Sequence, residues 1–276
     1  MQRELKHIAY PNIAYTICWQ KEQFVEELIP EHLLLHIVSG ELYIKEATGG
    51  RLYRAGETIL LRRNHLVKCG SQPLPGGTPN EVVYFILDRQ LLQDYARKHY
   101  RKKDDGGSDH PGVLSLQVSP ALKSLFDSLV PYIKSDKPLS EVMKRHKLEE
   151  AIHILLEQED SLEQCLFDFA DPGKTDLREF MLRNYVFNIP VNKFAELTGR
   201  SLSTFQRDFF KIFGMKASHW LLKQRLQAAH EALTSDHKRP SDVYLEFGFG
   251  DMSHFSKVFK SEYGYSPSFL SQKKNK

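Results

Sequence analysis

Two sets of side chains near the C-terminal end carry hydrogen-bonding and cationic groups at closely similar spacings, about fifty residues apart. The first set is Ser203, Thr204, Gln206, Arg207 and Lys211, and the second set is Met252, Ser253, Ser256, Lys257 and Lys260. Arginine and glutamine can pair with two atoms of a purine edge, serine and threonine adapt to several bases, and an apolar side chain suits a thymine methyl. Lys211 and Lys260 lie further along each set and suit phosphates. These residue types predict recognition of double-stranded DNA.

An aromatic frame must hold both sets on a surface. It consists of phenylalanine or tyrosine at i, i+4 and i+8, in two copies: Phe205, Phe209 and Phe213, then Phe255, Phe259 and Tyr263. Residues at this spacing share one face of a helix, so we expect the aromatics to face a core and the polar set to face solvent. The polar residues could also form an ordinary solvated face. The duplication of the frame favours a functional one.

A short apolar helix and a glycine precede each frame. Gly199 and Gly248 can reverse the chain because glycine accepts positive φ without a steric penalty. Ser201 suits the N-cap of the helix that follows it. Helix, glycine turn and second helix outline a helix-turn-helix, and we expect one at about 191–213 and another at about 240–263.

A longer helix is predicted between the two motifs, at about 217–235. Its apolar stripe is Trp220, Leu222, Leu226, Ala229 and Leu233. Such a helix is about 28 Å long, whereas two helices that read successive major grooves lie about 34 Å apart. The connector therefore has the scale needed to hold that separation.

Charge and turn signals divide the chain into two predicted domains. Residues 176–276 hold 16 lysines and arginines against 10 acidic residues, whereas residues 1–175 hold 22 against 25. The segment 169–176 contains Asp-Pro-Gly, and Asp176 and Glu179 have the spacing of a helix capping box. We therefore expect domains at 1–170 and 171–276, with the positive charge collected where a phosphate-binding module requires it.

Residues 176–270 resemble the DNA-binding domain of the AraC/XylS family of bacterial transcription regulators. GFGDMSHFSKVFKSEYGYSPSFL is similar to the family signature, and GRSLSTFQRDFFKIFG matches its first motif. The resemblance implies an all-α domain of seven helices with two helix-turn-helix motifs. By position, it implies base-facing roles for Ser203, Gln206, Arg207, Met252, Ser253, Ser256 and Lys257.

Two positions depart from the family pattern. Phe269 is followed by Leu270 where the family often has arginine, and Met252 stands where a polar residue is common. The second motif is therefore expected to rely more on thymine methyl or phosphate contacts. The resemblance implies a sequence-specific regulator, more often an activator than a repressor, that works with RNA polymerase. A general nucleic-acid binder with little sequence preference is a weaker alternative.

The N-terminal part reads as β-rich at about 5–87 and helical at about 88–168. Short runs rich in valine, isoleucine, leucine and tyrosine alternate with glycine turns, which is typical of a small barrel or jelly-roll. A helix at about 139–158 carries one predicted apolar stripe, used for packing within the domain or against a second copy: Val142, Leu148, Ile152 and Leu155. The fold class is thus α+β with two domains.

The segment from Glu31 to Asn64 resembles the cupin-like effector domain common in the same family. Cupin enzymes bind metal through His-x-His, a later glutamate and another histidine, whereas here the candidates are His32, His36, Glu41 and His65. The four-residue spacing matches that motif poorly, and no catalytic triad or paired carboxylates stand out. We expect no metal, no cofactor and no enzyme activity. The alternative is a cupin-type metal enzyme or sugar-binding module with an accessory DNA-binding domain.

Composition and partners complete these expectations. The chain has 276 residues, of which 41% are hydrophobic, and no apolar run near the roughly 20 residues of a membrane span. Three scattered cysteines, Cys18, Cys69 and Cys165, indicate a reducing compartment. We therefore expect a cytoplasmic protein without a membrane partner. Its N-terminal domain is expected to bind a small-molecule or protein effector, and a homodimer is anticipated.

Overall fold

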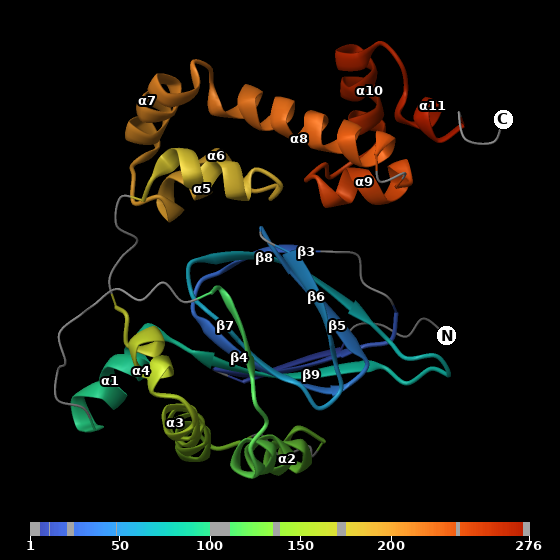
Figure 1. Ribbon diagram of the computed structural model, residues 1–276. Coiled ribbons are helices and arrows are strands. Elements are labelled where there is room, and N and C mark those ends of the chain that lie inside the picture. The colour runs from blue at the N-terminus through green and yellow to red at the C-terminus, as the bar shows by residue number, and fades with distance from the viewer. Residues whose placement is uncertain are drawn as a thin grey trace. The chain divides into compact units, whose positions relative to one another are not determined.

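The computed structural model describes residues 6–10, 12–20, 25–47, 49–99, 111–134, 139–169, 175–235 and 238–272. The chain divides into two compact units, Met1–Ala170 and Asp171–Lys276. Ten strands and four helices make up the described part of the first unit, and seven helices that of the second (Figure 1).

Two antiparallel sheets form the β-rich part of the first unit. The six-stranded sheet has the order β1 (Lys6–Tyr10), β2 (Ile13–Cys18), β9 (Asn80–Leu87), β4 (His32–Ser39), β7 (Thr58–Leu61) and β10 (Val113–Leu116). The four-stranded sheet has the order β3 (Val25–Ile29), β8 (His65–Gln72), β5 (Glu41–Glu46) and β6 (Gly49–Arg54). The β-rich expectation is confirmed, although the described strands form two open sheets and not one closed barrel. Strand β10 was not expected from the sequence.

Strand β4 places buried side chains on both faces of the six-stranded sheet, since successive side chains of a strand point to opposite faces. Leu35 and Ile37 of β4 join a cluster that includes residues of both sheets, such as Val67 of β8. Leu34 of β4 joins a second cluster with helices, among them Phe126. The sheet is therefore the middle layer of the unit, between the smaller sheet and the helices (Figure 1).

Four helices supply the outer layer: α1 (Arg89–His99), α2 (Pro120–Lys134), α3 (Glu141–Gln158) and α4 (Asp160–Leu166). Helix α2 begins at Pro120, as expected of a proline in the first turn. On α3, Leu148, Ile152 and Leu155 are buried as predicted, but Val142 is 67% exposed. The predicted stripe is wrong at Val142, because a step of six residues before Leu148 turns the side chain about 120° away from the buried face, and the neighbouring Met143 packs on the core instead.

The second unit consists of α5 (Leu177–Asn184), α6 (Val191–Leu197), α7 (Leu202–Phe213), α8 (Ala217–Thr234), α9 (Pro240–Glu246), α10 (Met252–Tyr263) and α11 (Pro267–Gln272). Helix α8 has 18 residues and is about 27 Å long. Figure 1 shows α6 and α7 at one of its ends and α9 and α10 at the other. The predicted residues of its stripe all pack on the core, with Leu222 partly buried, and Leu221 is buried in addition.

No helix in the described part of the chain combines the length and apolar character needed to cross a bilayer.

Candidate nucleic-acid interface

The first helix-turn-helix is built on α6 and α7. Gly199 has φ of +63° in the turn, a conformation that favours glycine. The Ser201 hydroxyl accepts a hydrogen bond from the Thr204 amide at 3.3 Å, which caps α7 as predicted. Phe205 and Phe209 are fully buried. The orientation of α7 is therefore set by its aromatic face and leaves the opposite face outward.

The outer face of α7 carries the first predicted set. Ser203, Gln206, Arg207 and Lys211 are exposed, whereas Thr204 is half-buried. The Thr204 and Ser203 hydroxyls lie 2.9 Å and 3.2 Å from that of Ser201, so the cap holds both. The Arg207 side chain is 64% exposed and its Nε lies 3.5 Å from Asp208. Because exposed ion pairs are weak, this arginine can exchange that partner for a base or phosphate.

Two apolar side chains share this outer face and were not singled out from the sequence. Phe210 is 58% exposed and Leu202 is 43% exposed. Phe210 follows Gln206 by four residues and therefore lies beside it on the helix. Phe210 lies outside the i, i+4, i+8 frame of buried aromatics, and this position in the sequence could have identified it as an exposed ring.

The second helix-turn-helix repeats this construction on α9 and α10. Gly248 has φ of +77°, and the Asp251 carboxylate accepts from the His254 amide at 2.6 Å to cap α10. Phe255 and Phe259 are fully buried. The two motifs therefore share one frame, with the same glycine turn, polar cap and aromatic core.

The outer face of α10 is more polar and differs in detail. Ser253, Lys257 and Lys260 are exposed, and Ser256 is half-buried. Met252 is partly buried and packs on the core cluster of α8 to α10. Lys260 occupies the position that Phe210 occupies on α7, fifty residues earlier. At this position α10 therefore presents a lysine, whereas α7 presents an aromatic ring.

Of the candidate histidines in the first unit, His32 and His36 are buried and His65 is half-buried. His36 stacks on Phe126 with ring centroids 4.5 Å apart, and its Nδ1 lies 2.9 Å from the Thr58 hydroxyl. Burial lowers the pKa of His32 to about 3, and burial also lowers the pKa of His36 and of His65. Within the described residues, no three histidine, cysteine or carboxylate side chains are arranged to hold a metal ion.

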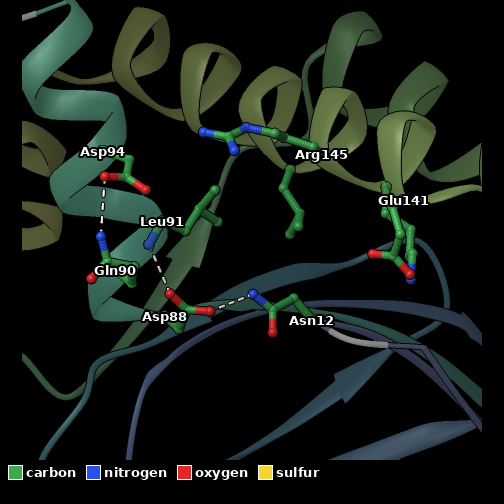
Figure 2. A pocket seen from close by; sticks show the side chains of 9 residues that line it. Asn12, Asp88, Gln90, Leu91, Asp94, Glu141 and Arg145 are labelled. Carbon is green, nitrogen blue, oxygen red and sulfur yellow. Dashed lines mark hydrogen bonds and ion pairs between the residues drawn. The ribbon is translucent and has the colours of Figure 1, made fainter.

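A recess of about 350 Å³ lies between α1, α3 and the turn before β2 (Figure 2). Asn12 donates to Asp88 at 2.5 Å, and Gln90 donates to Asp94 at 3.1 Å. Lys144 is buried and pairs with Glu141. The charged groups of this wall are thus already paired with one another or with neighbouring side chains.

Comparison with known proteins relates both units to one class of protein. The chain matches the family model described as a helix-turn-helix domain at residues 194–273 and the one described as the ExsA N-terminal regulatory domain at residues 32–165. It is 26% identical over 225 residues to the virulence regulon transcriptional activator VirF of Yersinia enterocolitica, covering 77% of this chain and 79% of that protein. It is 21% identical to the transcriptional regulator ExsA of Pseudomonas aeruginosa, covering 94% and 93%.

The chain is an AraC/XylS-family transcription regulator. The alternative of a cupin-type enzyme is wrong, because both matching models and the relatives are those of regulators. The helix-turn-helix match includes all ten of the residues predicted to meet DNA. Among solved structures, the regulator is similar to apo ToxT of Vibrio cholerae, with a TM-score of 0.45, 14% identity, and coverage of 94% of this chain and 97% of that one.

Proposed function

We propose that this regulator reads two half-sites of a promoter, with α7 in one major groove and α10 in the next. One observation carries the proposal: Arg207 and Lys257 occupy equivalent, exposed positions on helices whose aromatic faces are fully buried. Ser203, Thr204, Gln206 and Arg207 would meet bases in the first half-site. Lys211 would meet phosphate.

In the second half-site, Ser253, Ser256 and Lys257 would approach bases, and Lys260 would meet phosphate. Met252 would offer its exposed edge to a thymine methyl. The partial burial of Met252 and Ser256 supports a smaller share of base readout for α10 than for α7.

The effect on transcription is proposed to be activation through RNA polymerase in the bacterial cytoplasm. Its support is the relative from Yersinia enterocolitica, which is named a transcriptional activator. In vitro transcription from a bound promoter tests this proposal. We expect the regulator to raise transcript yield, and a fall in yield would show a repressor.

The domain at 1–170 is proposed to receive an effector, either a small molecule or a protein, and to mediate dimerisation. The recess between α1 and α3 has the volume of small-molecule sites, which run from about 300 to 1,000 Å³. The exposed Val142 on α3 supports a surface for a second copy. Analytical ultracentrifugation of wild type and Val142→Glu tests the dimer, which we expect the charge to weaken.

Footprinting of genomic fragments with the full-length regulator tests DNA reading. We expect two protected patches about one helical turn apart. The double variant Arg207→Ala, Lys257→Ala should lose both patches, while Lys123→Ala on α2, which removes one exposed charge from the first unit, should keep them. If the regulator protects no genomic fragment even in buffer of low salt concentration, the proposal is contradicted.

A further inference from the structure

Arg225, in the middle of α8, binds two chain segments that are far apart in the sequence. Its Nε donates to the Tyr185 carbonyl and its Nη2 to the Phe187 carbonyl, both at 2.7 Å. Its Nη1 donates to the Gly248 carbonyl at 3.4 Å. The first two acceptors precede α6 and the third lies in the turn between α9 and α10.

These acceptors lie at the C-terminal ends of two helices. Tyr185 is the C-cap of α5, and Gly248 follows the C-cap of α9. The last carbonyls of a helix lack partners within it and carry partial negative charge. One guanidinium, which stays charged at any relevant pH, therefore donates to the C-cap carbonyl of α5 and to carbonyls just past the ends of α5 and α9.

The turn of the second motif also touches the segment before the first motif directly. A Cβ on Gly248 would lie 2.6 Å from the Val186 carbonyl oxygen and 3.2 Å from the Arg225 Nε. A Cβ on Gly250 would lie 3.5 Å from the Asn188 side-chain nitrogen. The turn therefore packs against segment 185–188 with no room for a side chain at Gly248.

The position of this contact gives it a specific consequence. Helix α8 connects the two motifs covalently, and the core of the second motif packs on its C-terminal half. The contact at Arg225 and Gly248 adds a second connection, which joins the segment before the first motif to the turn of the second motif. Segment 185–188 leads into α6 and α7, and the turn at Gly248 leads into α10, so Arg225 links the supports of both recognition helices.

We propose that Arg225 is a positioning residue that fixes the orientation of α10 relative to α7 and thereby sets the half-site spacing that the regulator accepts. The inference rests on the proposed reading of two half-sites. Loss of Arg225 should leave each motif able to bind its own half-site and should remove the preference for one spacing.

The DNA experiment uses full-length protein and a footprinted promoter fragment with the half-site spacing unchanged, shortened or lengthened by one base pair, and a fragment with one half-site scrambled. Arg225→Gln should lower affinity for the natural spacing about tenfold, the scale of linked binding. Affinity for the scrambled fragment should change little, and the preference among spacings should disappear. Lys223→Gln, an exposed neighbour on α8, should behave as wild type.

Gly248→Ala supplies a second variant that disturbs the same contact with Arg225 present, and we expect the same loss of spacing preference. Arg225→Lys, which keeps the charge but not the three-way geometry, should be intermediate. Unchanged spacing preference in Arg225→Gln would overturn the inference. Equal losses on all fragments would also overturn it, because they would show a role in folding only.

A measurement without DNA separates this inference from the proposed function. Spin labels at Lys211→Cys on α7 and Ser261→Cys on α10, in a Cys69→Ser background, report the distance between the recognition helices. The labelled protein should show one narrow distance distribution, and Arg225→Gln should broaden it. An equally narrow distribution would overturn the inference even if the regulator binds DNA, whereas a broadened one together with no DNA binding would contradict the proposed function alone.

Discussion

The two units of this regulator place their ionisable side chains differently. The first unit buries histidine, lysine and arginine among strands and helices: His32, His36, Arg62, Lys68 and Lys144. In the described part of the second unit, the one buried polar side chain is Thr198. The second unit thus has an apolar core with its described cations at least partly exposed, whereas the first unit couples its stability to ionisation.

This difference matches what each unit has to present. A module that binds phosphates needs its positive charge on the surface and a core that does not respond to pH. Buried histidines make a fold sensitive to protons, since the neutral form alone is tolerated. Four predictions test the comparison, beginning with the core of the second unit.

The largest expected effect comes from truncating a core aromatic of either motif. Phe205→Ala and Phe255→Ala should each lower the free energy of unfolding of the second unit by about 3–5 kcal/mol, because each leaves a cavity. Urea unfolding followed by circular dichroism and by Trp220 fluorescence, in a Trp19→Phe background, measures it. Trp19 lies in the first unit and Trp220 is 5% exposed in the second.

Leu202→Ala is the matched control, since Leu202 lies on α7 but is 43% exposed. It should cost less than about 1 kcal/mol. If either phenylalanine variant lowers the free energy of unfolding by no more than Leu202→Ala does, the motif that contains it does not depend on the aromatic frame. Unequal costs for the two phenylalanines would break the equivalence of the motifs.

Acidification should destabilise the first unit and leave the second nearly unaffected. Burial depresses the pKa of His32 to about 3 in the folded state, against about 6.5 when unfolded. The unfolded chain therefore binds more protons between these values, and the free energy of unfolding falls as pH drops below 6.5. The slope approaches about 1.4 kcal/mol per pH unit for each such group. His36 and His65 add in the same direction.

Urea unfolding of full-length protein between pH 7 and 4 measures this slope, with Trp19 reporting the first unit and Trp220 the second in single-tryptophan variants. His32→Gln should reduce the slope seen by Trp19. The described histidines of the second unit are all at least partly exposed, so Trp220 should report little change. A flat response of Trp19 would contradict the buried-histidine account.

The sequence predicted the second unit well because its decisive signals are local. The i, i+4, i+8 aromatics, the glycine turn and the Ser201 cap all lie within one motif, so periodicity alone identifies them. The buried Leu221 lies outside the predicted stripe, about 100° from Leu222 around the helix.

Other features depended on contacts between distant parts of the chain and could not be predicted. Strand β9 pairs with both β2 and β4. No local sequence pattern predicts that strand order or the division into two sheets. Arg225 reads as an ordinary surface cation on an amphipathic helix. Its acceptors lie 40, 38 and 23 residues away, so only the fold shows its role.

The outer face of α7 should discriminate among base sequences. Arg207→Ala is expected to cost about 1–3 kcal/mol on the specific site and to relax preference at one base position. Titration of footprinted and random duplexes at one salt concentration measures both effects. Lys257→Ala on α10 should reduce the discrimination between specific and random DNA less than Arg207→Ala does, because its neighbours Ser256 and Met252 are partly buried. If Arg207→Ala loses equal affinity for specific and random DNA, Arg207 does not read bases.

The smallest expected effect concerns the position at which the two faces differ most. Lys260→Ala should weaken binding to all sequences alike and reduce the salt dependence by about one phosphate contact. Phe210→Lys, its counterpart on α7, should do the reverse, because it places a cation where α10 has one. Affinity measured against salt concentration resolves both changes. If Phe210→Lys leaves the salt slope unchanged, Phe210 does not face the phosphate backbone and the two helices approach DNA at different angles.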